Sequence, residues 1–141
     1  MITQMSKVYV VSDSRIVLNE LVSALDFIST DITTFEAAPE FLSACYKKSP
    51  DLAVLDMQVK NMGGIAISME LHLEESGGRL PHVPILLLLD RRADVFLAKR
   101  AKVEGYLVKP LESINLGEAA TAVLSGHLYH DRGKAPKTVA I

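Results

Sequence analysis

The sequence predicts an α/β fold in which a parallel sheet is wound with helices on both faces. Three observations predict it: four short runs are apolar at every position, helical patterns separate them, and 141 residues with 49% apolar side chains suit one domain. A strand that is apolar throughout is buried on both faces, as in a parallel sheet covered by helices. We therefore expect a βα unit repeated five times.

The apolar runs are expected to form central strands, and one half-polar run an edge strand. The apolar runs are residues 8–11, 52–55, 85–89 and 106–108, and the half-polar run is 32–35. The first and third strands should be neighbours, because a chain that starts mid-sheet and winds both ways must reverse there.

Helical patterns follow each of these strands. Apolar residues at i, i+3, i+4 and i+7 from Leu18 give the first helix one apolar face. Pro39 suits the first turn of the second. The third and fourth are expected over 64–75 and 94–102, and the fifth is expected to be capped by Ser113. Residues 126–141 are expected to form a tail or the start of a linker, so the domain is predicted to span residues 1–125.

Composition excludes several classes of protein. A net charge of −2 argues against a nucleic-acid binder, and the single cysteine, Cys45, cannot build a disulfide framework or a thiolate zinc site. No signal peptide is visible, and the longest apolar run is too short to span a bilayer. We therefore expect a cytoplasmic protein that does not contact membranes.

Charged side chains follow four of the predicted strands. They are Asp13, which is also placed to cap the first helix, Asp56, Asp90 and Lys109. Ligands of an open parallel sheet bind where its strands end, so these side chains should meet at one edge. Two close carboxylates need a cation between them, and Mg²⁺ with oxygen ligands is the natural one. With a lysine for an anion, this set suits phosphoryl transfer to the exposed aspartate.

Five short motifs in order resemble the response regulator receiver domain of two-component signalling. They are VVSD at 10–13, DLAVLD at 51–56, NMGG at 61–64, VPI at 83–85 and GYLVKP at 105–110. The resemblance covers residues 7 to 124. It implies a flavodoxin-like (βα)5 doubly wound parallel sheet with strand order 2-1-3-4-5, and residues 1–125 are predicted to be the receiver domain.

The resemblance also implies roles for single residues. Asp56 falls on the phosphoacceptor, and Lys109 on the lysine that contacts the phosphoryl group. Mg²⁺ would be held by Asp13, Asp56 and the backbone carbonyl of Gln58. Pro110 falls where the family has a cis peptide bond.

Four positions depart from the family pattern, and one is kept. Ser12 replaces the first carboxylate of the acidic pair, and Leu89 replaces the hydroxyl that ends the fourth strand. Asp90 replaces a small residue, and Lys60 a proline. Tyr106, the aromatic of the family switch, is kept. Asp90 is expected either to be a solvated loop carboxylate or to lie close enough to repel a phosphoryl group.

The sequence leaves two functions open. In the first, a histidine kinase or phosphotransfer protein phosphorylates Asp56. Output is then by contact with an unidentified protein or a second copy in a homodimer, or by an output domain outside this sequence; the chain is a signalling protein and not an enzyme. In the second, the chain is a pseudo-receiver, an interaction module that does not switch. The resemblance places output on an exposed face with Phe96, Lys99, Arg100, Lys102 and Tyr106, and donor docking at the first helix.

Overall fold

The computed structural model describes residues 6–28, 31–60 and 62–133. Asn61, part of the NMGG motif, and residues 134–141 of the expected tail lie outside these ranges. The strands are β1 (Lys7–Val11), β2 (Asp31–Phe35), β3 (Leu52–Asp56), β4 (Ile85–Leu89), β5 (Gly105–Val108) and β6 (Tyr129–His130). The helices are α1 (Arg15–Leu25), α2 (Ala38–Lys47), α3 (Gly64–Ser76), α4 (Val95–Arg100) and α5 (Ser113–Leu124). In these ranges, no helix has both the length and the apolar character that crossing a membrane requires.

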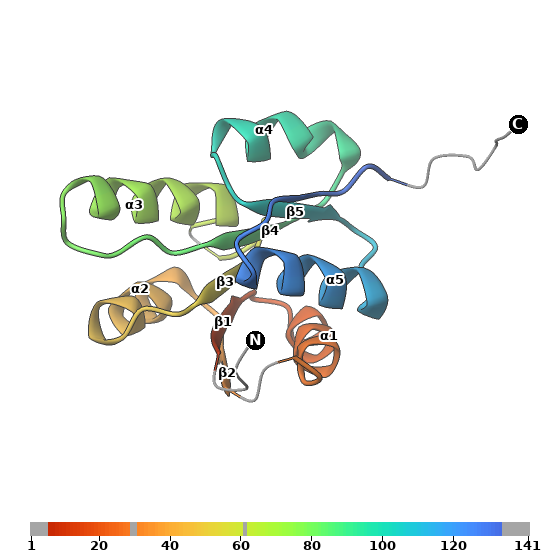
Figure 1. Cartoon of the computed structure of the whole chain (residues 1–141), viewed down its shortest axis with the longest axis horizontal. Helices are drawn as coiled ribbons and strands as arrows, with labels where there is room; N and C mark the ends of the chain where they lie inside the picture. Colours follow the sequence, from red (N-terminus) through yellow and green to blue (C-terminus); the bar gives the residue numbers. More distant parts are fainter. Residues whose placement is uncertain (1–5, 29–30, 61, 134–141) are drawn as a thin grey trace, which may run out of the picture.

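The strands form one parallel sheet in the order β2-β1-β3-β4-β5-β6, with helices on both sides (Figure 1). The fold class and the order 2-1-3-4-5 are confirmed. The half-polar strand β2 lies at the edge, and β1 lies beside β3, as expected. The carboxyl ends of β1, β3, β4 and β5 therefore meet at one edge of the sheet.

Alternating strand residues build two cores, one on each face of the sheet. On one face Val10 packs with Leu21 of α1 and Leu116 of α5. On the other face Leu87 packs in a cluster with Phe41 of α2. Each fully buried leucine contributes about 1.5–3 kcal/mol through removal of its surface from water, so both layers hold the strand ends in place.

Two helix starts differ from the sequence-based expectation. Ser14, not Asp13, caps α1: its backbone is extended and its hydroxyl accepts the N–H of Val17 at 3.3 Å. Ser113 does not cap α5, because Glu112 is the last extended residue and Ser113 is already helical. In each case the cap lies one residue from the predicted position, at the last residue with extended backbone.

The fourth helix is shorter than the 94–102 expected. A 3₁₀ turn, Arg92–Asp94, precedes it, and α4 ends at Arg100. The buried Asp94 carboxylate accepts the Arg91 N–H at 3.1 Å, which stabilises the tight turn at the start. Lys102 adopts a left-handed φ of 57°, which no helix interior tolerates.

A sixth strand lies in the segment expected to be a tail. Gly126, with a φ of 88°, turns the chain after α5, and Tyr129 and His130 then pair in parallel with β5. A two-residue strand has no alternating pattern to recognise, which is why the sequence did not reveal it. The end of the domain at residue 125 stays a prediction.

Candidate functional site

Asp56 is the last residue of β3, between β1 and β4, and is only 1% exposed, so the expectation of an exposed aspartate is wrong. Its Oδ1 accepts a hydrogen bond from Lys109 Nζ at 2.6 Å and a longer one from the Gln58 N–H at 3.2 Å. Its Oδ2 accepts the Ser12 hydroxyl at 2.7 Å. The carboxylate is thus held by one cation, one backbone donor and one hydroxyl, which satisfies the charge in spite of burial.

Lys109 also contacts a second carboxylate, that of Asp90. Its Nζ lies 2.9 Å from Asp90 Oδ1, and Gln58 Nε2 donates to Asp90 Oδ2 at 2.7 Å. Asp90 is therefore paired, and the alternative of a free, solvated carboxylate is wrong. Burial favours the neutral form of each partner, but hydrogen bonds outweigh it: those to Asp56 and Asp90 raise the pKa of Lys109, and those from Lys109 and Gln58 lower the pKa of Asp90.

Ser12 belongs to the site, although the sequence only marked it as a departure. It is fully buried, it donates to Asp56, and its Oγ accepts the Ser14 N–H at 3.0 Å. The signal that could have revealed this contact was its place: it directly follows β1, at the same edge as Asp56. An uncharged donor here stabilises the Asp56 carboxylate, where a second carboxylate would repel it.

Asp13, the expected metal ligand, is exposed. Within the described ranges, no hydrogen bond or ion pair joins Asp13 to Asp56, and no three His, Cys, Asp or Glu side chains form a group that could hold a metal. The assignment of Asp13 and of the Gln58 carbonyl as metal ligands stays a prediction.

The Gly63–Gly64 pair lets α3 begin directly against the site strand. A Cβ on Gly64 would lie 2.6 Å from the backbone oxygen of Asp56, and one on Gly63 would lie 2.5 Å from that of Met57. These contacts are too short for any side chain, so glycine is required at both positions for this close approach. The pair brings the loop after Asp56 close to the first turn of α3.

The two expected switch positions are both buried. Leu89 is fully buried at the end of β4, and its carbonyl accepts the Lys109 N–H at 2.9 Å. Tyr106 is 4% exposed and stacks on His130 at a ring distance of 5.0 Å. The expectation that Tyr106 is exposed on the output face is therefore wrong, because His130 of β6 stacks on its ring, whereas Phe96 is 58% exposed as expected. The Lys109–Pro110 bond is cis, as the resemblance implied.

In this site a single ammonium group contacts two carboxylates. Lys109 is the side chain that bridges Asp56 and Asp90, and it offers a positive charge to any anion that replaces Asp90. The Asp56 oxygens are chemically suited to attack an electrophile, but the lysine and Ser12 cover them. The site can therefore bind an anion and carry a nucleophile once its cover moves.

Comparison with known proteins gives one family. Residues 8–121 match the response regulator receiver domain. The transcriptional regulatory protein TdiR of Thauera aromatica is 32% identical over 123 residues, 85% of this chain and 52% of that protein. The DNA-binding transcriptional regulator NtrC of Escherichia coli is 28% identical over 95% of this chain and 27% of its own length. The chain thus spans about half or less of these relatives.

Solved structures show the same fold. The BeF3-activated DrrB receiver domain has a TM-score of 0.71 at 22% identity, and covers 86% of this chain and 98% of its own. The receiver domain of RcsB from Salmonella enterica has a TM-score of 0.74 at 18% identity, covering 91% and 94%. The response regulator ChrA, of a heme-sensing two-component system, has 0.68 at 27%, covering 95% and 62%.

Proposed function

Because the chain belongs to the response regulator receiver domain family, we propose that Asp56 accepts a phosphoryl group from a histidine kinase or phosphotransfer protein. The observation that carries the proposal is the 2.6 Å contact between Lys109 Nζ and Asp56 Oδ1 at the end of β3. It puts a nucleophilic carboxylate and a cation for the transferred group at one point. Output then follows through contact with another protein.

The transfer itself needs little from the chain beyond position and charge. A carboxylate oxygen of Asp56 forms the new bond to phosphorus, while the bond from phosphorus to the donor nitrogen breaks and the donor keeps that electron pair. Lys109 turns from Asp90 to the phosphoryl oxygens and offsets their charge. Ser12 holds the oxygen it contacts and so orients the carboxylate.

Magnesium fits the oxygen donors that this edge offers. The carboxylates of Asp13 and Asp56 and the carbonyl of Gln58 are hard ligands, and Mg²⁺ typically takes one or two carboxylates with water and phosphate oxygens. The hydroxyl of Ser12 leaves Asp56 a lone pair for a metal, since each carboxylate oxygen accepts more than one partner. When bound, the ion supplies positive charge to the phosphoryl oxygens.

A small phosphodonor tests the proposal directly. Incubation with acetyl phosphate and Mg²⁺ should add one acid-stable, base-labile phosphoryl group, measured by intact mass. Asp56→Asn should remove it, whereas Asp26→Asn, at an exposed carboxylate after α1, should not. A mass shift that persists in Asp56→Asn would point to Asp90 as the acceptor. No shift in any variant would favour the pseudo-receiver.

The metal should stabilise the folded chain by mass action. At a hundredfold excess over its dissociation constant, Mg²⁺ is expected to add about 2.7 kcal/mol to the free energy of unfolding. Asp13→Ala should abolish the gain, because the exposed Asp13 carboxylate has its predicted role only in the metal site. Thermal unfolding with and without millimolar Mg²⁺ measures this gain. A wild-type melting temperature that does not change with Mg²⁺ would contradict the predicted metal site.

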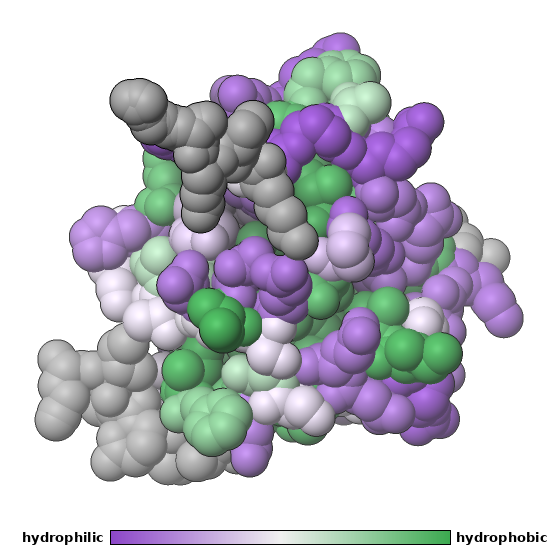
Figure 2. All heavy atoms as spheres, turned by 90° about the vertical axis from the view of Figure 1, so that its right-hand side faces the viewer, coloured by the Kyte–Doolittle hydropathy of each residue, from purple (hydrophilic) through white to green (hydrophobic). Residues whose placement is uncertain are grey.

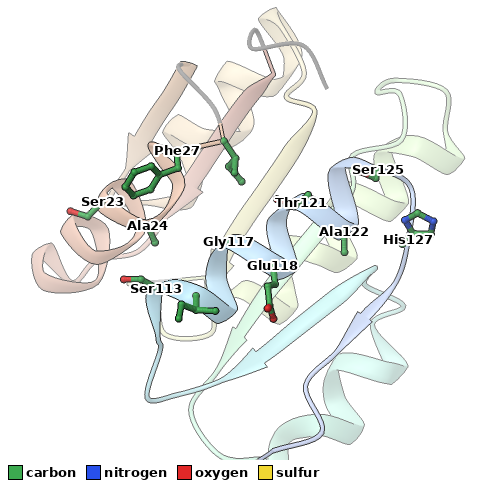
Figure 3. A pocket seen from close by; sticks show the side chains of 12 residues that line it. Ser23, Ala24, Phe27, Ser113, Gly117, Glu118, Thr121, Ala122, Ser125 and His127 are labelled. Atoms are coloured by element: carbon green, nitrogen blue, oxygen red, sulfur yellow. The ribbon is translucent and has the colours of Figure 1, made fainter. Parts of the chain in front are cut away.

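The phosphodonor has an apolar surface available along α1 and α5. A hollow of about 690 Å³ lies between α1 and α5 (Figure 3), and the ring of Phe27 at its rim is 93% exposed. Ile114, in the first turn of α5, is 74% exposed and also lines it. Exposed large apolar side chains that converge on one hollow are typical of protein contacts, and we assign donor docking to this surface.

The output face is expected to act through its cations, since Tyr106 is covered. Lys99, Arg100 and Lys102 are exposed at the end of α4, with Phe96 58% exposed beside them in sequence. The face shown in Figure 2 carries green apolar patches among purple hydrophilic ones. A small apolar centre with several cations fits an acidic surface.

Charge reversal tests that face. Lys99→Glu with Arg100→Glu should weaken association with a partner or a second copy while the fold stays intact, measured by analytical ultracentrifugation and circular dichroism. Each rim charge affects association mainly through its electrostatic attraction, so raising the salt concentration should weaken the wild type as well. Unchanged association would assign the contact to the hollow between α1 and α5 instead.

A further inference from the structure

The segment His127–Gly133, here called the C-terminal strap, lies along β5 (Figure 1). Its Tyr129 N–H donates to the Glu104 carbonyl at 3.0 Å, and its Asp131 N–H donates to the Tyr106 carbonyl at 3.3 Å. These bonds occupy backbone groups of β5 that would otherwise form a free sheet edge. None of the sequence motifs or the proposed chemistry accounts for this segment.

Asp131 fixes the strap through three of its oxygen atoms, Oδ1, Oδ2 and the backbone carbonyl oxygen. Its Oδ2 accepts the Val108 N–H at 2.9 Å, and its Oδ1 accepts Arg92 Nη2 at 3.1 Å. The Arg92 guanidinium also donates to the Asp131 carbonyl. Burial raises the pKa of Asp131, but hydrogen bonds to the carboxylate from Val108, Gly133 and Arg92 outweigh it and lower the pKa, so the carboxylate stays charged at neutral pH. The Asp131 carboxylate therefore makes an ion pair with Arg92 through one oxygen and a hydrogen bond to the Val108 N–H through the other.

The strap joins the same two loops that the site joins. Val108 is followed directly by Lys109, and Arg92 lies two residues after Asp90. One bridge, Asp90–Lys109, links the loops inside the site at 2.9 Å. A second bridge, through Asp131, links them at the sheet edge. If Asp90 is to move off Lys109, the short segment between Asp90 and Arg92 must bend or the outer bridge must break.

The site needs that movement in order to react. Asp56 is 1% exposed beneath Lys109, and Lys109 must leave Asp90 to offset the charge of a phosphoryl group. A bridge that keeps Asp90 in place therefore stabilises the unphosphorylated arrangement. A contact shifts the equilibrium between two conformations only if its free energy differs between them. The outer bridge between Arg92 and Asp131 is such a contact, because it favours the conformation in which Asp90 contacts Lys109.

We propose that the C-terminal strap is a clamp on the Asp56 site: the Arg92–Asp131 contact holds Asp90 on Lys109, and release of the strap from β5 promotes phosphoryl transfer to Asp56. Arg92 and Asp131 act as positioning residues, since neither touches Asp56. The proposal rests on the proposed function of Asp56. Coupling is reciprocal at equilibrium, so phosphorylation of Asp56 must weaken the strap's binding to β5 by the same factor by which the bound strap lowers the equilibrium extent of phosphorylation.

The strap is held weakly enough to act in this way. Its His127, Leu128 and His130 side chains are exposed, and most of its contacts are backbone hydrogen bonds and the exposed Arg92 pair. The stacking of the His130 ring on the Tyr106 ring adds one more contact between the strap and β5. Elements with few buried apolar contacts open at low free energy, so the strap can leave while the sheet stays folded.

The first test measures phosphorylation of the full chain. With acetyl phosphate and Mg²⁺, Asp131→Ala should raise the initial rate by about fivefold or more, a coupling of ordinary size. Arg92→Gln should do the same, and Asp90→Ala with Asp131→Ala should add nothing to Asp90→Ala alone. The matched control is Arg132→Ala, at an exposed neighbour in the strap. A wild-type rate in Asp131→Ala and Arg92→Gln would overturn the clamp.

The second test needs no phosphorylation. Hydrogen exchange of the Tyr129 and Asp131 amides in unphosphorylated protein should be faster in Asp90→Ala than in the wild type, because loss of the inner bridge loosens the outer one. Unchanged exchange would overturn the coupling. If exchange accelerates but no variant is ever phosphorylated, the coupling between strap and site is supported and the proposed function of Asp56 is the part that fails.

Discussion

Lys109→Met is expected to lower the free energy of unfolding by about 3 kcal/mol at neutral pH. Lys109 is the cation that touches both site carboxylates, at 2.6 Å from Asp56 and 2.9 Å from Asp90. Methionine keeps the apolar stem but removes the charge, so Asp56 stays buried beside Asp90 with no cation between them. Removing one partner of a buried ion pair costs about 3–5 kcal/mol, and the partial exposure of Asp90 favours the lower end.

Removing the charge of Asp56 should affect the free energy of unfolding far less than removing the charge of Lys109. Asp56→Asn leaves Lys109 with Asp90 as its partner, so it should cost much less than Lys109→Met or even stabilise the chain. In the Lys109→Met background, Asp56→Asn should restore most of the lost stability, because it removes one of two unpaired like charges. Urea unfolding at an unchanged m-value measures all three variants. A Lys109→Met variant as stable as Asp56→Asn would contradict the shared-cation description of the site.

Order of strands is what made much of this site predictable from sequence. Asp56 and Lys109 each follow an apolar run, and the predicted order 2-1-3-4-5 places their strands on either side of β4. Residues that follow parallel strands meet at one edge whatever their side chains do. The apolar pattern and the direction of the chain therefore place Asp56 and Lys109 at one edge, and the resemblance to the family supplies the strand order that brings the two together.

Side-chain partners within that edge could not be predicted in the same way. Spacing shows that Ser12 and Asp90 end their strands, but not that Ser12 donates to Asp56 or that Asp90 shares Lys109. These contacts depend on rotamers, and the rotamers depend on packing from both faces of the sheet. Burying a carboxylate without hydrogen-bond partners costs free energy, so Asp56 was expected to have such partners. The sequence does not show which residues they are.

The strap was missed for a related reason. Its contacts join residues far apart in the chain, as with Arg92 and Asp131, and they are polar. Apolar periodicity is the main signal that a sequence carries about its strands, and a strand held by polar contacts has none. The contacts that hold the strap thus lie where sequence patterns are least informative.

Leu89→Thr combined with Asp90→Ala is expected to enlarge the conformational response to phosphorylation, which in the wild type should be weak. A hydroxyl at position 89 can donate to a phosphoryl oxygen, and a hydrogen bond to a charged group contributes about 1.5–3 kcal/mol. The leucine cannot donate, and it fills the apolar cluster that also contains Tyr106. Asp90 adds a carboxylate that competes with the phosphoryl group for Lys109.

The response is best measured as amide chemical-shift changes of residues 89–94 and of Tyr106 on phosphorylation. The matched control is Leu88→Thr, which makes the same substitution one residue earlier, where the side chain packs in the core on the α1 and α5 face. It should cost comparable stability without enlarging the response, since its hydroxyl faces away from the Leu89 side of the sheet. A ligand shifts two states only by its differential interaction with them, and Leu89→Thr supplies the interaction that the wild type lacks. A full two-state shift in the wild type, with no gain from Leu89→Thr, would refute this explanation of a weak switch.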